Sequence, residues 1–332
     1  MRHERRLFII IIMVAALTHT GCTEDETVLG DWVKRSDFDG VARSDASSFS
    51  IGDKGYVVGG YDGKNRLSDL WEYNADQDYW TQKAAFPGTA RNTATAFSLD
   101  GKGFIGTGYD GDSYLKDFWM YDPDLNTWTR KADFGGSARS GAISFGINSQ
   151  GYMGTGYDGN FLKDIWRYDP SEDSWTQIVS IGGSKRNNAT AFVSGSKAYV
   201  VCGINNGSYI TDFWRFDPVT VAWTEMRSIA NETDDDFDDD YNIARANALA
   251  LVIGDRVFIT CGESGSLRGD TWEYIPATDL WEATTDFEGT TRTAAISITT
   301  GTRAFVATGR SSTYRFDDMW EFLPDVEYDS GY

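Results

Sequence analysis

Short runs of alternating hydrophobic and polar residues, separated by turn residues, follow one another along most of the chain. In residues 91–128 an alternating segment is followed by Gly-Lys-Gly, a second apolar segment that ends at Gly108, and a Tyr-Asp-Gly turn. A third segment around Trp119 and Tyr121 then leads through an Asp-Pro turn to Trp128. Because side chains alternate between the two faces of a strand, each run predicts a short strand, and the turns predict a four-stranded antiparallel sheet.

The same unit occurs six times. Each copy opens with an Arg, and a Trp follows 27 or 28 residues later. The period is 47 or 48 residues and is stretched once to 58 or 59. Repeats of this length with four strands each predict an all-β, six-bladed β-propeller that occupies residues 31–323 as one domain. The opening residues are Arg43, Arg91, Arg139, Arg186, Arg245 and Arg292.

The two ends of the repeat region complement each other. Residues 31–38 match the fourth strands at 80–86 and 128–134, whereas the last unit has no Trp nine residues after Trp320. We therefore predict that residues 31–36 form the outer strand of the sixth blade, which leaves no unpaired edge at the seam. Residues 324–332 carry no feature of the repeat and are predicted to be a C-terminal tail.

The N-terminus has the pattern of an export signal. Three Arg within residues 2–6 precede an apolar run at 7–17. As a helix that run would be about 17 Å long, which is too short for a bilayer core of about 30 Å. We therefore predict a signal peptide over residues 1–21.

Cys22 is the predicted lipidation site. It follows Gly21 as in bacterial lipoproteins, although His19 stands where that motif favours Leu. Residues 22–30 are predicted to be an acidic tether, similar to the export tag of some surface lipoproteins. We expect a lipid anchor at the outer membrane or cell surface; the alternative is a secreted or periplasmic protein without lipid on Cys22.

Charge and composition narrow the chemistry. The net charge is −20, which disfavours a nucleic-acid partner. The only histidines, His3 and His19, lie in the predicted signal peptide, so the mature chain has no His for a catalytic triad, a zinc site or a copper site. Cys202 and Cys261 hold equivalent positions in neighbouring units and are predicted to be buried free thiols.

The fifth unit contains an insertion, NETDDDFDDDY, at residues 231–241. Its seven carboxylates predict a solvated acidic loop. A weak Ca²⁺ site is the alternative, although the spacing lacks the Gly and the final Glu of an EF-hand loop. The candidate ligands are Asp234, Asp236, Asp238 and Asp240. We expect no other cofactor.

The Gly59-Gly60 pair, Tyr73 and Trp80 resemble the double Gly, Tyr and Trp of the kelch repeat, which belongs to the galactose oxidase-like propeller superfamily. The resemblance covers about residues 31–323, although only the first unit keeps both glycines. It implies a non-catalytic propeller that binds a protein, peptide or glycan at the loop face around its channel mouth. We expect this propeller to be a monomer. The alternative is a carbohydrate-active enzyme similar to the kelch sialic acid mutarotase, although no residue here maps onto that site; the copper oxidase of the superfamily needs His.

The six opening Arg residues are the candidate ligand-binding residues. The first strand of each blade should be innermost, which places these residues near one mouth of the channel. Resemblance to eukaryotic kelch propellers implies that such Arg residues hold acidic peptides, and we expect this role first at Arg245 or Arg292. The alternative is a structural pairing with the Asp at the start of each third strand. Those residues are Asp69, Asp117, Asp164, Asp212, Asp270 and Asp317.

Overall fold

The computed structural model describes residues 29–329. The predicted signal peptide, Cys22 and residues 22–28 of the predicted tether lie outside the described residues. Within the part that is described, no helix is long and apolar enough to cross a membrane.

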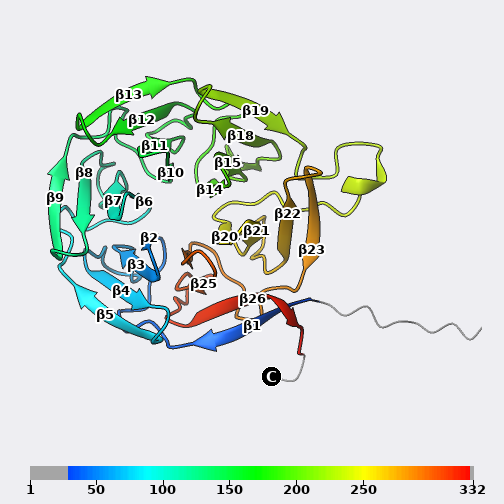
Figure 1. The fold of residues 1–332 in the computed structure, drawn as a ribbon, viewed down its shortest axis with the longest axis horizontal. Helices are drawn as coiled ribbons and strands as arrows, with labels where there is room; N and C mark the ends of the chain where they lie inside the picture. The colour runs from blue at the N-terminus through cyan, green and yellow to red at the C-terminus, as the bar shows by residue number, and fades with distance from the viewer. Residues whose placement is uncertain (1–28, 330–332) are drawn as a thin grey trace, which may run out of the picture.

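Six four-stranded antiparallel sheets surround a central axis and form the blades of a propeller (Figure 1). Blade 1 contains β2 (Ser47–Ile51), β3 (Lys54–Val58), β4 (Leu70–Asn74) and β5 (Tyr79–Lys83). Blade 2 contains β6 (Thr95–Leu99), β7 (Lys102–Gly106), β8 (Phe118–Asp122) and β9 (Thr127–Lys131). Blade 3 contains β10 (Ile143–Ile147), β11 (Gln150–Gly154), β12 (Ile165–Asp169) and β13 (Ser174–Ile178).

The remaining blades continue the ring. Blade 4 contains β14 (Thr190–Ser194), β15 (Lys197–Val201), β18 (Phe213–Asp217) and β19 (Ala222–Met226). Blade 5 contains β20 (Leu249–Ile253), β21 (Arg256–Thr260), β22 (Thr271–Ile275) and β23 (Leu280–Thr284). Blade 6 contains β24 (Ile296–Thr299), β25 (Ala304–Ala307), β26 (Met319–Glu327) and β1 (Leu29–Arg35). The predicted fold is therefore confirmed.

The N-terminal strand closes the ring as predicted. Strand β1 pairs antiparallel with β26, with Trp32 opposite Phe322 and Lys34 opposite Trp320. The predicted bounds need correction, because β1 already begins at Leu29 and β26 continues to Glu327, which lies opposite Leu29 across an irregularity in the register. The sheet therefore extends into the segment that we predicted to be the C-terminal tail.

Aromatic side chains fill the space between neighbouring blades. Between blades 1 and 2, Phe49 stacks on Tyr56, and both rings contact Tyr121 of the next blade. Phe86, which follows the fourth strand of blade 1, packs edge-on against Trp128. Each blade buries its faces against its neighbours, so an incomplete ring would expose apolar surface on the blades beside the gap.

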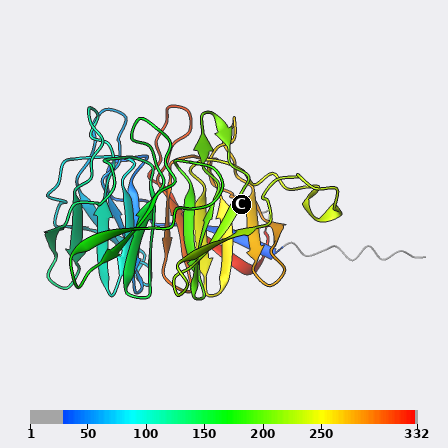
Figure 2. The same cartoon turned by 90° about the horizontal axis from the view of Figure 1, so that it is seen from above.

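Two sets of loops gather at one end of the ring, which we call the mouth. They are the loops before each first strand and the loops between second and third strands, joined for example by the bridge between Ser44 and Tyr61. In blade 4 the second of these loops forms a small hairpin of β16 (Ile204–Asn205) and β17 (Ser208–Tyr209), which stands above the sheets in Figure 2. The acidic insertion, with the 3-10 turn η1 (Asp236–Asp238), projects from the outside of the ring (Figure 1).

Candidate functional site

The six opening Arg residues are at most 1% exposed. In blade 2, Arg91 donates from Nη1 and Nη2 to the two carboxylate oxygens of Asp117, at 2.7 Å each. Its Nη1 also donates to the carbonyl of Thr107 at 2.9 Å. The Nε1–H of Trp119 donates to the same carboxylate at 2.7 Å. A bidentate, buried pair of this kind is strong and geometrically specific, and here it holds the start of the third strand against the first.

The backbone at each opening Arg also joins neighbouring blades. The N–H of Gly60 in blade 1 donates to the carbonyl of Arg91 in blade 2 at 2.8 Å. The equivalent Gly of every other blade makes the same bond to the next Arg, including Gly309 to Arg43 across the seam, at 2.8 or 2.9 Å. The geometry therefore favours the structural alternative for all six Arg residues, including Arg245 and Arg292. None of the six presents its guanidinium to solvent in this structure. Their role in ligand binding stays a prediction.

Blades 4 and 5 depart from this pattern, and blade 6 departs from the sequence prediction. In blade 5, Arg245 reaches the carboxylate of Asp270 with Nη2 alone, at 2.6 Å, while Arg268 donates to the other oxygen at 2.8 Å. In blade 6 the partner of Arg292 is Asp318, at 2.6 Å, and not the predicted Asp317. Asp318 lies two residues before Trp320, which is the Asp-x-Trp spacing found in every blade, whereas Asp317 lies three residues before it. In blade 4 the carboxylate of Asp212 bonds Arg186 and the N–H of Ser184, which leaves the buried Nε1 of Trp214 without an acceptor among the described residues.

The residue before each inter-blade Gly has a left-handed backbone. Gly59 has a φ of 66°, and Thr107, Thr155 and Thr308 have φ values of 61°, 54° and 60°. A Cβ-bearing residue in this conformation is strained by about 1–3 kcal/mol. The left-handed backbone directs the carbonyl at this position toward the opening Arg. In the first unit Gly59 adopts this conformation without strain, whereas the Thr and Cys residues of the other units adopt it at an energetic cost.

The two body cysteines occupy this same position. Cys202 and Cys261 are fully buried free thiols, as predicted. Burial raises the pKa of both thiols to about 11. At neutral pH the thiolate, which is the reactive form, is therefore scarce.

The carboxyls that pair with the opening Arg residues are shifted toward the ionised form. Burial by itself raises the pKa of Asp117, but the hydrogen bond and the charge of Arg91 outweigh it and hold that pKa below its ordinary value. The same balance lowers the pKa of the equivalent carboxyls of Asp69, Asp164 and Asp318. Burial also raises the pKa of Asp270, but a hydrogen bond from Arg268 and the charge of Arg245 outweigh it. The pairs are therefore intact at neutral pH and sensitive only to strong acid.

We accordingly expect the free energy of unfolding to fall below about pH 4. A carboxyl with a lowered pKa in the folded state gives its full stabilisation above the pKa of the unfolded chain, about 3.9, and loses it as the pH falls through the folded-state pKa. Urea unfolding between about pH 6 and pH 2 measures this loss. The Asp117→Asn variant should start less stable and lose less on acidification; a loss equal to that of the wild type would contradict the assignment.

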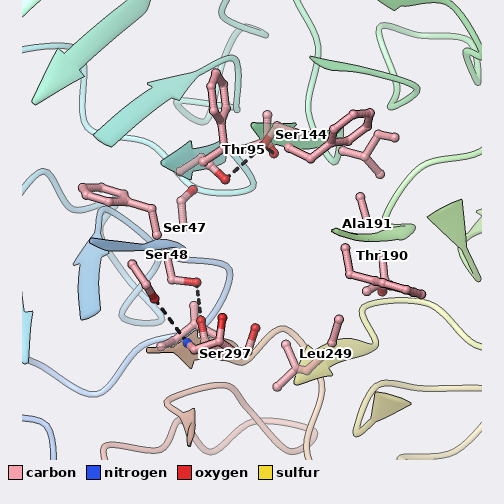
Figure 3. Close-up of a pocket in the computed structure, with 18 of the residues that line it drawn as sticks. Ser47, Ser48, Thr95, Ser144, Thr190, Ala191, Leu249 and Ser297 are labelled. Atoms are coloured by element: carbon pink, nitrogen blue, oxygen red, sulfur yellow. Dashed lines mark hydrogen bonds between the residues drawn. The ribbon is translucent and has the colours of Figure 1, made fainter. Parts of the chain in front are cut away.

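The channel along the axis has a volume of about 500 Å³ and is lined mostly by Ser, Thr, Ala and Gly, together with larger apolar residues such as Leu249 (Figure 3). Hydroxyl-bearing residues line it from blades 1, 2, 3, 4 and 6, with Thr190 in blade 4, whereas blade 5 contributes aliphatic residues such as Ala250. The hydroxyl of Ser48 donates to the carbonyl of Ser297 at 2.8 Å, and the hydroxyls of Thr95 and Ser144 are 2.6 Å apart. These bonds join first strands of adjacent blades. None of the described residues that line the channel is charged.

One residue of each blade forms a ring where the channel reaches the mouth. All six have a left-handed backbone, and most donate their N–H to the carbonyl of the preceding member, for example Thr93 to Asp45 at 2.9 Å. Asp45 is the one charged member, and its carboxylate accepts a hydrogen bond from Ser44 at 2.8 Å. Burial raises the pKa of Asp45, against the lowering effects of Ser44, Arg310 and Arg315. The ring comprises Asp45, Thr93, Gly141, Asn188, Asn247 and Ala294.

Arginine and tyrosine side chains alternate on the loops around this ring. The guanidinium of Arg66 lies 5.3 Å from the ring centre of Tyr61 and 5.0 Å from that of Tyr109. On the other side, Arg315 lies 4.8 Å from the ring centre of Tyr61. Tyr114 continues the row, 5.4 Å from Tyr109. We call this row, together with Arg310, the mouth surface: Tyr61, Arg66, Tyr109, Tyr114, Arg310 and Arg315.

The three cations of the mouth surface make no salt bridge within the described part of the chain. Arg66 donates to the side-chain oxygen of Asn92 at 3.1 Å, Arg310 to the carbonyl of Ser311 at 3.4 Å, and Arg315 to the carbonyl of Tyr61 at 3.0 Å. All three are half-buried. On a chain of net charge −20, they form a local positive region that an anionic ligand can neutralise.

Sequence reasoning missed the mouth surface. It read the Tyr-Asp-Gly segments as turns and gave no role to the residues after them. A signal was present in the sequence, at the position five residues after the Tyr of each Tyr-Asp-Gly turn. This position holds Arg66 in blade 1 and Tyr114 in blade 2. In blade 6, where Arg310 replaces the Tyr, it holds Arg315. Side chains at that position reach the next blade, so their partners are set by the closed ring.

The acidic insertion is ordered by one of its own carboxylates. Asp238 is 1% exposed and accepts hydrogen bonds from the N–H of Thr233 at 3.0 Å and from its hydroxyl at 2.9 Å. Over residues 29–329, no group of three or more His, Cys, Asp or Glu is arranged to hold a metal ion. A weak Ca²⁺ site at Asp234, Asp236, Asp238 and Asp240 stays a prediction, which calorimetric titration with Ca²⁺ would test.

Comparisons with known proteins agree with this architecture. Residues 33–189 match a family model described as the KLHDC2/KLHL20/DRC7 Kelch-repeats domain, and residues 185–229 match one described as the Kelch motif. A search of curated protein sequences finds no match. A solved structure titled "Structure of YjhT" is similar with a TM-score of 0.73 at 15% identity, over 86% of this chain and 95% of that chain. At this identity the likeness concerns the fold alone. The chain is an all-β, six-bladed propeller built from kelch repeats.

Proposed function

We propose that the protein is a non-catalytic binding module of the cell envelope or cell surface, which holds an acidic segment of a protein or peptide at the mouth surface. Kelch propellers generally mediate protein interactions. The observation that carries the proposal is the set of three guanidinium groups at Arg66, Arg310 and Arg315 that have no carboxylate partner among the described residues.

The geometry suits a carboxylate-bearing, extended ligand. Cation–π contacts with Tyr61 and Tyr109 fix the guanidinium of Arg66 before any ligand arrives, which reduces the entropy lost on binding. The mouth surface is also asymmetric, since Ile204 and Glu263 take the place of the Tyr residues in blades 4 and 5. An acidic ligand should therefore lie over blades 6, 1 and 2. A glycan that carries carboxylates is the other ligand of the same chemistry, and an array of acidic peptides and glycans distinguishes them.

We expect Arg66→Ala and Arg315→Ala to weaken binding of the best ligand on that array by about 10- to 100-fold, because each removes a charge-assisted hydrogen bond. Their unfolding free energies should change by no more than about 1 kcal/mol, since neither cation is in a salt bridge. Arg130→Ala is the matched control, because Arg130 is exposed and pairs only with Asp133 three residues away. Unchanged affinity in both mouth variants would place the ligand elsewhere.

A carbohydrate-active enzyme, similar to a sialic acid mutarotase, is the second candidate. The observation in its favour is Asp45, a carboxyl of raised pKa that lies at the channel mouth close to Arg310 and Arg315. Groups with shifted pKa values gather at catalytic sites, where an acid or base must work near neutral pH. Mutarotation of free sugars, including acidic ones, is the assay; catalysis that is lost in Asp45→Asn would establish an enzyme.

We propose that Cys22 carries a lipid anchor. The support is its sequence context, with a basic and apolar segment before it and an acidic segment after it. Labelled palmitate should enter the wild-type protein in cells and should not enter Cys22→Ser, which should be released in soluble form. Equal release of both proteins would leave ordinary secretion as the explanation.

A further inference from the structure

The seam between blades 5 and 6 lacks contacts that join the outer strands elsewhere. In blades 1 to 4 the Trp of the fourth strand donates its Nε1–H to a carbonyl just after the preceding fourth strand, as Trp128 does to Ala84 at 2.9 Å. The N–H of Ala84 in turn donates to Asn126, in the turn between the third and fourth strands of blade 2, at 2.9 Å. Both bonds are present between blades 6 and 1, 1 and 2, and 2 and 3. Blades 3 and 4 keep only the Trp bond, and blades 4 and 5 keep only the bond to the turn residue. Among the described residues, neither bond is present between blades 5 and 6.

Ring closure removes this arrangement at the seam. The third strand β26 and the fourth strand β1 come from opposite ends of the chain, so no turn with an Asp or Asn connects them. The Trp of β1, Trp32, is 3% exposed, and its Nε1–H has no acceptor among the described residues. The hydroxyls of Thr284 and Thr285 instead donate to the carbonyl of Leu29, at 2.9 and 3.2 Å.

A groove of about 1050 Å³ occupies this place, on the outside of the ring. We call it the seam groove; it is larger than the central channel. Its apolar part is formed by Trp32, Phe287 and Trp320, and its polar part includes Asp31 and Glu288. Phe287 packs edge-on against Trp32 at a centroid distance of 4.8 Å, so the aromatic wall is fixed.

The groove is strongly acidic. Asp31, Asp286 and Glu288 line it and form no salt bridge with a Lys or Arg of the described chain, while the one Lys of its lining, Lys34, pairs with Asp37 at 3.2 Å. One carboxylate oxygen of Glu288 is buried and has no hydrogen-bond partner among the described residues. Burial raises the pKa of Glu288, and the neighbouring Asp31 raises it further. A positive group in the groove would offset the repulsion between these carboxylates and compensate for their desolvation by direct attraction.

We propose that the seam groove binds a cationic segment of another protein, with a Lys or Arg against Asp31 and Glu288 and an apolar side chain beside Trp32 and Phe287. This site is separate from the mouth surface and takes ligands of the opposite charge. The neighbouring part of the chain does not fit the groove, because Glu24, Asp25 and Glu26 carry the same charge as its lining. Two buried groups have no hydrogen-bond partner among the described residues. The indole N–H of Trp32 is a donor that needs an acceptor, and the carboxylate oxygen of Glu288 is an acceptor that needs a donor, so the segment can supply both.

Calorimetry with blocked tetrapeptides on the folded protein tests the proposal, using Lys-Leu-Lys-Leu as the cationic probe and Glu-Leu-Glu-Leu as the acidic one. The cationic peptide should bind at millimolar concentration or below and the acidic one should not. The Asp31→Asn/Glu288→Gln double variant should bind the cationic peptide at least tenfold more weakly. Asp133→Asn is the matched control, because Asp133 follows the fourth strand of blade 2 just as Asp286 follows that of blade 5; it should bind like the wild type.

Hydrogen exchange then locates the bound peptide. Protection should increase in β1 and in residues 284–288, and this second readout holds even if the double variant folds poorly. The proposal would be overturned by no binding at millimolar peptide, by equal binding of the two peptides, or by protection confined to another acidic region such as residues 231–241. An equal loss of affinity in Asp133→Asn would do the same, since it would mean that overall charge alone attracts the peptide.

Discussion

A chain that starts at residue 36 is expected to lose its cooperative unfolding transition or to aggregate, whereas a chain that starts at residue 29 unfolds cooperatively. The truncation removes the whole of β1 and exposes the edge of β26, which then becomes a template for pairing with other chains. It also removes Trp32, which packs against Phe287 and Phe322. Loss of a buried Trp side chain alone costs about 3–5 kcal/mol, against a total stability of about 5–15 kcal/mol for a typical domain.

Urea unfolding followed by Trp fluorescence and by size-exclusion chromatography measures this effect. Trp32→Ala in the chain that starts at residue 29 is the intermediate case, because it keeps the strand pairing and loses only the side chain. A chain starting at residue 36 with the midpoint of the longer chain would mean that β1 contributes nothing to closure. Deletion of residues 325–332 should also lower stability, since Asp325 pairs with Arg256 at 2.7 Å and Glu327 lies opposite Leu29.

The Arg91→Ala substitution is expected to lower the free energy of unfolding by about 3–5 kcal/mol, because it leaves the carboxylate of Asp117 half-buried without its cation. It also leaves the buried carbonyl of Thr107 without the donor at Nη1. Arg91→Lys should recover only part of the loss, since an ammonium group cannot make the bidentate pair. Chemical unfolding of the purified variants at neutral pH gives the numbers.

Two controls make this result specific. Arg130→Ala removes an exposed cation of the same blade and should cost no more than about 0.5 kcal/mol. Asp117→Asn keeps the volume of the partner and should destabilise in the same direction as Arg91→Ala, with a double variant that is far from additive. Additive losses, or an unchanged stability in Asp117→Asn, would show that the buried pair is not the source of the effect.

The opening Arg residues and the mouth Arg residues thus have opposite expected signatures. Arg91 is buried and bonded on every side, so its loss should appear as lost stability. Arg66 and Arg315 are half-buried and unpaired with any described carboxylate, so their loss should appear as lost affinity. Measuring both quantities on each variant separates a structural Arg from a binding one, a distinction that the residue type by itself does not make.

Sequence periodicity was sufficient to predict the six-bladed propeller, because strands, turns and aromatic residues recur at nearly constant spacing in all six units. The two ends of the repeat region identified how the ring closes. Residues 31–38 match a fourth strand and the unit of Trp320 lacks one, so pairing the two completes the sixth blade. The partner of Arg292 was missed although the Asp-x-Trp spacing points to Asp318. Consistent use of that spacing in all six units would have found it.

The tertiary structure decided what spacing cannot encode, namely which groups are buried and which cross from one blade to the next. The six opening Arg residues were ambiguous in sequence, and burial by the closed ring is what favours the structural role. Arg66 meets Tyr109, and Arg315 meets Tyr61, only because neighbouring loops converge at the mouth. The seam groove exists because closure joins the two ends of the chain without a turn. Local sequence determines strands and turns through side-chain periodicity, whereas these sites arise from contacts between residues as far apart as Trp32 and Phe287, which only the completed ring brings together.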